Sequence, residues 1–204
     1  MEKRVLFRDF EERDIDFIYE CKNNEKLNSM IVGQSKPFSH SEAEKWVHGC
    51  MGEHDAFKFW AMCTNDEEKR IVGWVSLSQI DKINSSACFH GIVIGDDDYR
   101  DGIAWIESYL FILEQVFVKY KLNRVWGAYL EDHPASGLIA DAVLLRTEGI
   151  FRNAIFKNGI YHNLIQNAML AEEYFKYVSD DSLTFNSVFK RLAKNIKQNR
   201  KKNK

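Results

Sequence analysis

A long apolar helix pattern between two strand-like segments constrains the fold of this sequence more than any other feature. Along residues 101–120, apolar side chains recur at spacings of three and four, which predicts one amphipathic helix. The stripe consists of Ile103, Ile106, Leu110, Leu113, Phe117 and Tyr120. Residues 87–94 and 124–130 on either side have the composition of β-strands. A strand, a helix and a strand in this order form a crossover, so we expect both strands in one sheet with the helix against its face.

The other strand-like segments come in pairs joined by short polar turns, as in β-hairpins. The sharpest turn signal is Asn158-Gly159, because both central residues of a type I′ turn need positive φ angles. Further strands are expected at residues 5–8, 57–63, 71–77, 148–156 and 160–170, and further helices at residues 14–23, 39–52 and 134–145. The predicted fold class is therefore α/β, with a mixed, mostly antiparallel sheet flanked by helices on both faces.

One domain is expected over residues 1–171, because no Gly/Ser/Pro-rich linker and no repeat interrupts them. Residues 172–204 follow as a C-terminal extension. Apolar residues between Phe185 and Leu192 predict a short extra helix that docks on the domain, and residues 194–204 are expected to fray.

Charge is distributed unevenly along the chain. Residues 190–204 contain eight Lys or Arg and no Asp or Glu, whereas the first 189 residues carry a net charge of −10. A basic tail could neutralise nucleic-acid phosphates. It lacks interleaved aromatic residues, so a solvated tail is the favoured interpretation and no nucleic-acid partner is expected.

The cysteines and the N-terminal residues indicate a cytoplasmic protein. Cys21, Cys50, Cys63 and Cys88 form no C-x-x-C pair and fit no zinc spacing, so we expect four reduced thiols. The first residues lack the apolar core of a secretion signal, and no run of about 18 apolar residues predicts a membrane-spanning helix. No membrane partner is expected.

The junction between residues 92 and 105 is the best candidate binding segment. A buried strand ends there, and a helix opens near Gly102 with unpaired amides and the positive end of its dipole. Gly102 would let a ligand approach the backbone and Arg100 adds charge, as a phosphate or pyrophosphate site needs. The alternative is a plain junction with Asp101 as a helix cap. Residues 96–98 are three aspartates without a further ligand at EF-hand spacing, so we expect a solvated turn and no metal.

Several motifs along the chain together carry a family resemblance. They are Leu6–Arg8, Asp14–Tyr19, Ile71–Val75, Tyr99–Ala104, Glu148–Arg152 and Asn158–Asn163. In this order and spacing, the run from Val5 to about Tyr174 resembles the GNAT superfamily of acetyl-CoA-dependent N-acetyltransferases, in its RimJ/RimL-like branch. The resemblance covers roughly four-fifths of the chain and implies a GNAT-like fold.

The resemblance implies acetyl-CoA as the acyl donor and a place for it. The strand before the loop would splay from its neighbour at a bulge, for which Gly91 is suited, and bond the pantetheine arm through Ile92, Val93 and Ile94. The amides of the following loop would hold the pyrophosphate. These belong to Arg100, Asp101, Gly102, Ile103 and Ala104. The amine would attack the thioester directly, so no cysteine nucleophile is needed.

The catalytic groups common in the family do not map onto this chain. Leu145 stands where many members have a tyrosine acid, and residues 131–134 replace an expected asparagine. We therefore predict His90, on the splayed strand, and Asp132, at the end of a central strand, as catalytic residues. A half-buried histidine and a helix cap are the respective alternatives.

Other candidates surround these two. His133 shares the position and the capping alternative of Asp132, and Tyr161 and His162 could either line the acceptor cleft or pack the last hairpin. Cys88 is not expected to act as a nucleophile, because no base is paired with it in the pattern.

The sequence thus predicts an N-acetyltransferase that acts on a primary amine, either a small molecule such as an amino sugar or a protein N-terminus. Two alternatives stay open: a non-catalytic GNAT-like protein that binds acyl-CoA or a partner, and a nucleic-acid-associated protein that uses its tail. Exposed edge strands of such a sheet could pair two copies into a homodimer.

Overall fold

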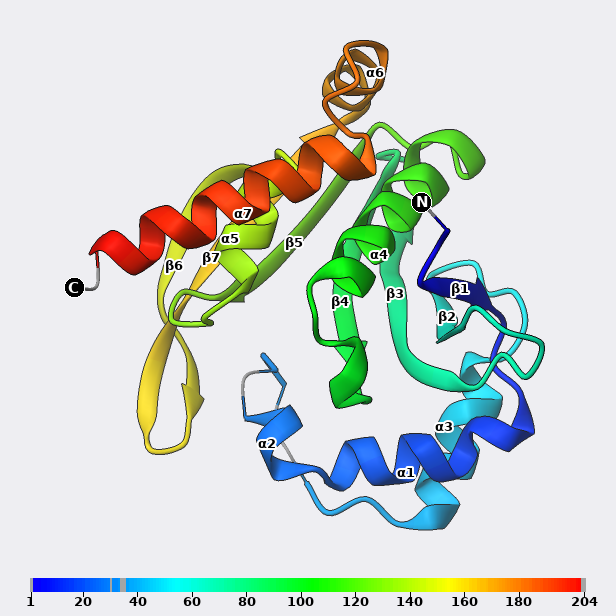
Figure 1. Cartoon of the computed structure of the whole chain (residues 1–204). Coiled ribbons are helices and arrows are strands. Elements are labelled where there is room, and N and C mark those ends of the chain that lie inside the picture. Colours follow the sequence, from blue (N-terminus) through cyan, green and yellow to red (C-terminus); the bar gives the residue numbers. More distant parts are fainter. Residues whose placement is uncertain (1, 30, 34–35, 203–204) are drawn as a thin grey trace.

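The computed structural model describes residues 2–29, 31–33 and 36–202, except for the side chains of His90 and Lys202. Within these ranges, seven strands form one sheet in the order β1-β2-β3-β4-β5-β7-β6 (Figure 1). The strands are β1 (Val5–Arg8), β2 (Lys58–Thr64), β3 (Ile71–Asp81), β4 (Ser86–Ile94), β5 (Arg124–Leu130), β6 (Arg146–Lys157) and β7 (Ile160–Leu170). All neighbours are antiparallel except β4 and β5, which are parallel. The predicted mixed, mostly antiparallel sheet is confirmed.

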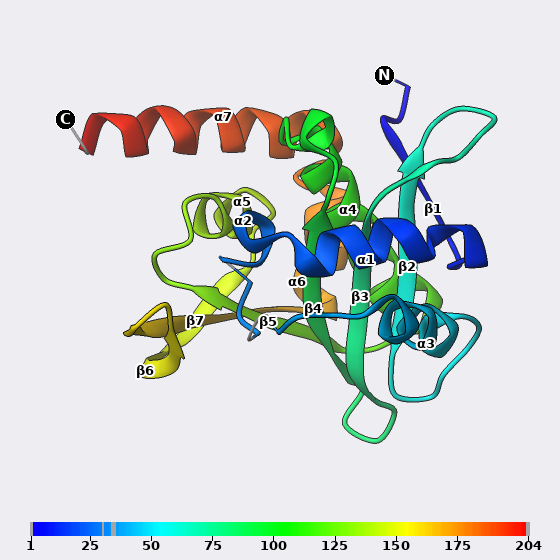
Figure 2. The same ribbon diagram turned by 90° about the horizontal axis from the view of Figure 1, so that it is seen from below.

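Helices cover both faces of the sheet, as predicted (Figures 1 and 2). The helices are α1 (Ile15–Asn23), α2 (Glu25–Asn28), α3 (His40–Cys50), α4 (Ile103–Glu114), α5 (Ser136–Ala142), α6 (Ala171–Ser179) and α7 (Phe185–Lys202). Helices α1 and α3 pack on one face through a core that includes Ile18, Val47 and Trp74. Helices α4, α5 and α7 share the core of the other face.

The crossover helix and the last hairpin follow their sequence signals closely. Helix α4 begins at Ile103, and a single π-helical segment, Gln115–Lys119, continues it. Its apolar stripe is buried against the sheet at Ile106, Leu113 and Phe117. The turn between β6 and β7 has φ angles of 52° at Asn158 and 83° at Gly159, as a type I′ turn requires.

The predicted extra helix of the C-terminal extension is present and docked, but it is longer than expected, and residues 203–204 lie outside the described residues. Residues 194–202 do not fray but continue α7 as one helix. The helix is fixed to α5 because Arg191 Nε donates to the carbonyl of Ala142 at 2.8 Å and Asn195 donates to that of Leu138 at 3.2 Å. Its apolar residues Val188 and Leu192 are buried in the same core as the sheet. Long-range docking therefore holds a segment whose composition alone indicates a solvated tail.

A buried ion pair joins β1 to the start of α1. The guanidinium of Arg8 bonds both carboxylate oxygens of Asp14, at 2.7 and 2.8 Å, and the Asp14 side chain is fully buried. The same carboxylate accepts the amide of Glu11. The neighbouring carboxylate raises the pKa of Arg8. Every charge here has a partner, so the pair tolerates its burial.

We expect Asp14→Asn to lower the free energy of unfolding by about 3–5 kcal/mol, because it leaves the Arg8 cation without its carboxylate. Urea denaturation measures the change. The matched control is Asp16→Asn on the same helix, whose exposed side chain pairs with His40 and should contribute less than about 1 kcal/mol. Equal losses in the two variants would contradict this role of Asp14.

Helix α5 is capped by a neutral histidine. Nδ1 of His133 accepts the amides of Ala135 at 3.2 Å and Ser136 at 3.0 Å, which is possible only for an unprotonated nitrogen. Burial lowers the pKa of His133, although Asp132 opposes this. The sequence alternative of a capping residue is therefore confirmed for His133.

This cap should make stability depend on pH. Because the pKa of His133 is lower in the folded chain, its contribution is present above the ordinary value of about 6.5 and is lost as the pH falls below it. His133→Asn supplies an oxygen for the same amides without titrating, so the unfolding free energy of this variant should decline less between pH 7 and pH 5. Parallel curves for both proteins would contradict the assignment.

Candidate functional site

The parallel strands β4 and β5 separate soon after they pair. Only Ser86, Ala87 and Cys88 pair with β5, opposite residues 124–126. From Phe89 onward, the edge of β4 that faces β5 has no strand partner in the described part of the chain. Backbone donors and acceptors on this edge are therefore available to a ligand. We call the gap between the two strands the split.

A β-bulge marks the point of separation. Ser76 of β3 pairs with Gly91, and Leu77 pairs with Phe89, so His90 is the extra residue. Gly91 has a φ angle of +134°, which an L side chain rarely adopts. On β5, a Cβ atom at Gly127 would lie 3.0 Å from the Phe89 carbonyl oxygen. The bulge inferred at Gly91 is thus present, and Gly127 allows the last close approach of the strands.

The predicted pantetheine-binding residues line the free edge. Ile92, Val93 and Ile94 pair with β3 on their other side, opposite Val75, Trp74 and Gly73. A Cβ atom at Gly73 would lie 2.2 Å from the Val93 carbonyl oxygen, so only glycine permits this register. The close approach of β3 and β4 therefore explains why a glycine stands at position 73.

The opening of α4 offers unpaired amides. Those of Asp101, Gly102 and Ala104 find no acceptor among the described residues. The other two predicted ligands are engaged: the amide of Arg100 donates to Asp97, and that of Ile103 donates to Asp101 Oδ1 at 2.8 Å. Gly102 stands at the helix start with a φ angle of +90°. Free amides at a helix N-terminus can bind an anion.

Two arginines fix the turn before α4. The guanidinium of Arg100 donates to the carbonyls of Ile94 and Gly95 and pairs with Asp97. These contacts use its charge to stabilise the turn. Arg4 pairs with the Asp101 carboxylate at 2.8 Å. Asp101 is thus a helix cap with a compensated charge, as the alternative interpretation proposed, and its repulsion of a phosphate is reduced.

The catalytic candidate Asp132 contacts His162, which was a candidate for the lining of the acceptor cleft. Oδ2 of Asp132 lies 2.9 Å from Nδ1 of His162, which β7 positions beside the end of β5. The histidine side chain is largely buried, whereas that of Asp132 is 54% exposed. Nε2 of His162 faces the Lys157 carbonyl oxygen at 3.3 Å. Tyr161 is exposed on the hairpin, and the side chain of His90 lies outside the described residues.

Tyr129 is a candidate that the sequence patterns did not reveal. It lies on β5 beyond the point where the strands separate, and its hydroxyl would be 3.3 Å from a Cβ atom at Gly137 of α5. Burial, together with Asp141 and Glu131, raises the pKa of Tyr129, so the phenol stays protonated at neutral pH. Its hydroxyl bonds no described residue. No local pattern distinguishes such a tyrosine from a packing one.

Lys157 joins the β6–β7 hairpin to the segment around α2. Its ammonium donates to the carbonyls of Asn28 and Gly33, at 2.7 and 2.8 Å, and to that of Ile31. Three acceptors match the three donors of the group. Burial lowers its pKa. Lys157 thereby ties β6 to α2, which Figure 1 shows at the open end of the split, between β4 and the β6–β7 hairpin.

The cysteines do not have the environment of nucleophiles. All four are free and buried. Burial raises the pKa of Cys21 and Cys50 to about 12 and that of Cys63 to about 11. The pKa of Cys88, which lies nearest the split, is also raised by burial. A thiol in this state is a poor nucleophile.

Among the described residues, no group of three His, Cys, Asp or Glu side chains could hold a metal ion. No helix there is both long and apolar enough to cross a membrane.

Solved structures share this fold. A spermidine N-acetyltransferase from Vibrio cholerae, in complex with CoA and spermine, is 21% identical with a TM-score of 0.74, covering 84% of this chain and 98% of that one. A GNAT-family acetyltransferase from Bacillus anthracis is 21% identical with a TM-score of 0.71, covering 85% and 98%. At these identities the likeness establishes the fold alone.

The solved structures establish the fold, and the match to a protein-family model establishes the family. No curated protein matches the chain. The acetyltransferase (GNAT) domain matches residues 4–143, which is more than half of the sequence and includes β1 to α5. On this match, the chain belongs to the acetyltransferase (GNAT) domain family.

Proposed function

We propose that this protein transfers the acetyl group of acetyl-CoA to a primary amine by direct attack. The observation that carries the proposal is the split, where the free edge of β4 leads into the unpaired amides at the start of α4. The edge offers hydrogen bonds to the amide groups of pantetheine, and the amides of Asp101, Gly102 and Ala104 offer a cradle for the pyrophosphate. Family membership supports the same donor.

The reaction needs no covalent enzyme intermediate. The amine nitrogen attacks the thioester carbonyl carbon, the carbon–sulfur bond breaks, and the sulfur leaves as a thiolate. A backbone amide on the free edge of β4 can stabilise the oxyanion that develops. The buried, protonated state of Cys88 agrees with this direct route.

Two proton transfers complete the reaction. The amine must lose a proton, and we assign this step to Asp132, supported by His162, with His90 as the second candidate. The leaving thiolate must gain one, and Tyr129 is suited to this because its hydroxyl is protonated and bonds no other described residue. Tyr129 thus replaces the acid that the family position Leu145 cannot provide.

The acceptor we favour is a cationic amine. The first 189 residues carry a net charge of −10, which attracts cations. A structural neighbour carries the name spermidine N-acetyltransferase and was solved with spermine. An amino sugar and a protein N-terminus, the acceptors that the resemblance of the C-terminal hairpin suggests, are the alternative acceptors to test. A cytoplasmic location would supply both acetyl-CoA and such amines.

Titration of acetyl-CoA into the purified protein tests the donor, and release of free CoA tests catalysis. We expect binding in the micromolar range, and CoA release on addition of one class among spermidine, an amino sugar and a peptide with a free N-terminus. Absence of acyl-CoA binding would sink the proposal. Binding without release from any amine would favour the non-catalytic alternative.

Tyr129→Phe tests the proposed acid. We expect kcat to fall about 10²-fold while the affinity for acetyl-CoA is unchanged, since only the proton donor is lost. Tyr177→Phe on α6, away from the split, is the matched control and should retain full activity. A Tyr129→Phe protein with wild-type kcat would rule out this role.

A further inference from the structure

Helix α7 lies directly over the start of α4. A Cβ atom placed on Gly102 would be 3.8 Å from Cδ2 of Leu192. Figure 1 shows α7 crossing in front of α5, with its first turns beside α4, and Figure 2 places α7 on the outside of that face. A ligand whose pyrophosphate rests on the amides near Gly102 therefore emerges next to α7.

The outward face of α7 is strongly basic and unpaired. It carries Lys190, Lys194, Lys197 and Lys201, opposite the buried Leu192. Among the described residues, no carboxylate lies within ion-pair distance of any of these lysines. A shallow groove of about 370 Å³, lined entirely by residues of α7, runs along this face. Unpaired cations on a docked helix form a preorganised surface for an anionic ligand.

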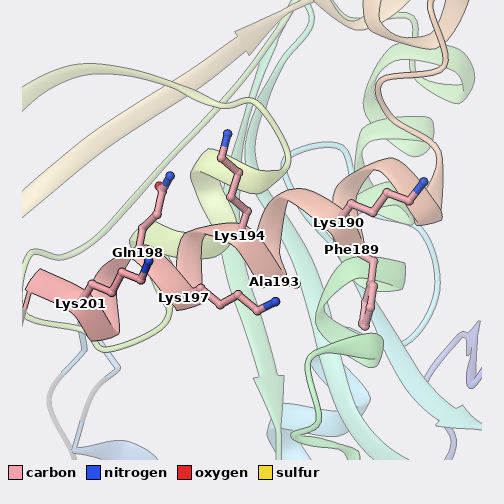
Figure 3. Close-up of a pocket in the computed structure, with 7 residues that line it drawn as sticks. All are labelled: Phe189, Lys190, Ala193, Lys194, Lys197, Gln198 and Lys201. Carbon is pink, nitrogen blue, oxygen red and sulfur yellow. The ribbon is translucent and has the colours of Figure 1, made fainter.

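The side chains that line the groove extend from two different sides of α7. Figure 3 shows Phe189 and Lys197 extending from the lower side of α7. Lys194 and Gln198 extend from the upper side. Ala193, between Phe189 and Lys197, leaves room along the lower side. The Phe189 ring is 46% exposed and stacks on Phe185 with its centroid 6.0 Å away.

We propose that Phe189 and Lys197 bind the 3′-phosphoadenosine end of the acyl-CoA. The exposed ring stacks on the adenine, and the ammonium pairs with the 3′-phosphate. This assignment rests on the proposed function, because it takes the pyrophosphate to lie at the start of α4. It extends the donor site to a helix beyond the residues that the family domain matches, which end at 143.

Charge and position both favour this ligand. Outside residues 190–204 the chain is net negative, so a polyanionic cofactor gains most from the lysines of α7. Adenine stacks well on an exposed aromatic ring. Val188 and Leu192 of α7 are already buried in the core that α4 and α5 share, which leaves Phe189 as its exposed large apolar side chain.

The test compares CoA with 3′-dephospho-CoA, which lacks only the 3′-phosphate. Isothermal titration should show that the wild type prefers CoA by roughly tenfold. Lys197→Gln should bind CoA about five- to tenfold more weakly, bind 3′-dephospho-CoA as before, and lose the preference. Phe189→Ala should weaken both ligands by about five- to tenfold and keep the preference, since both contain adenine.

Lys176→Gln is the matched control, because it removes the same charge from an exposed position on α6, outside the residues that line the groove. It should retain the affinities of the wild type, and thermal unfolding of each variant should show that α7 remains docked. Equal wild-type affinities for the two ligands, or a preference retained in Lys197→Gln, would overturn the assignment. A wild type that binds neither ligand would instead contradict the proposed function itself.

Discussion

The early separation of β4 from β5 is the constraint on which the rest of the site depends. Parallel strands hydrogen-bonded along their full length would leave no free edge between them. Here the bulge at His90 turns β4 away after three paired residues. The chain then passes through the turn at residues 95–102 into α4, so a free strand edge and free helix amides follow each other within one short segment. One extended ligand can therefore meet both.

That short segment is held from several directions. Arg100 fastens the end of β4 to the turn, Arg4 joins the turn to the start of β1, and the Glu107 carboxylate accepts the amides of Arg4 and Val5. Hydrogen bonds to charged groups contribute more than neutral ones. The charges of these residues are used to fix geometry, which leaves neutral backbone amides as the groups that face a ligand. Such a cradle binds an anion without a cation at the same point.

Local signals in the sequence were enough for the features that depend on neighbouring residues. The α4 stripe, the Asn158-Gly159 turn and the bulge at Gly91 each arise from periodicity or backbone conformation within a few positions. Tyr129 and Lys157 were missed because their roles depend on residues distant in the chain. Lys157 bonds Asn28, 129 positions away, and composition around either residue is that of an ordinary strand. The length of α7 was misjudged for the same reason, since its contacts are with α4 and α5.

The distribution of charge along the chain suits the opposite charges of the two proposed substrates. An acetyl donor such as acetyl-CoA is a polyanion, whereas an amine acceptor arrives as a cation, so a uniform surface charge would repel one of them. This chain is acidic over its first 189 residues and basic in its last fifteen. Docking of α7 places that basic segment over the start of α4, while Asp132 and Glu131 lie at the other end of β5. The two signs of charge are thus kept on different parts of one site, and each can attract its own substrate.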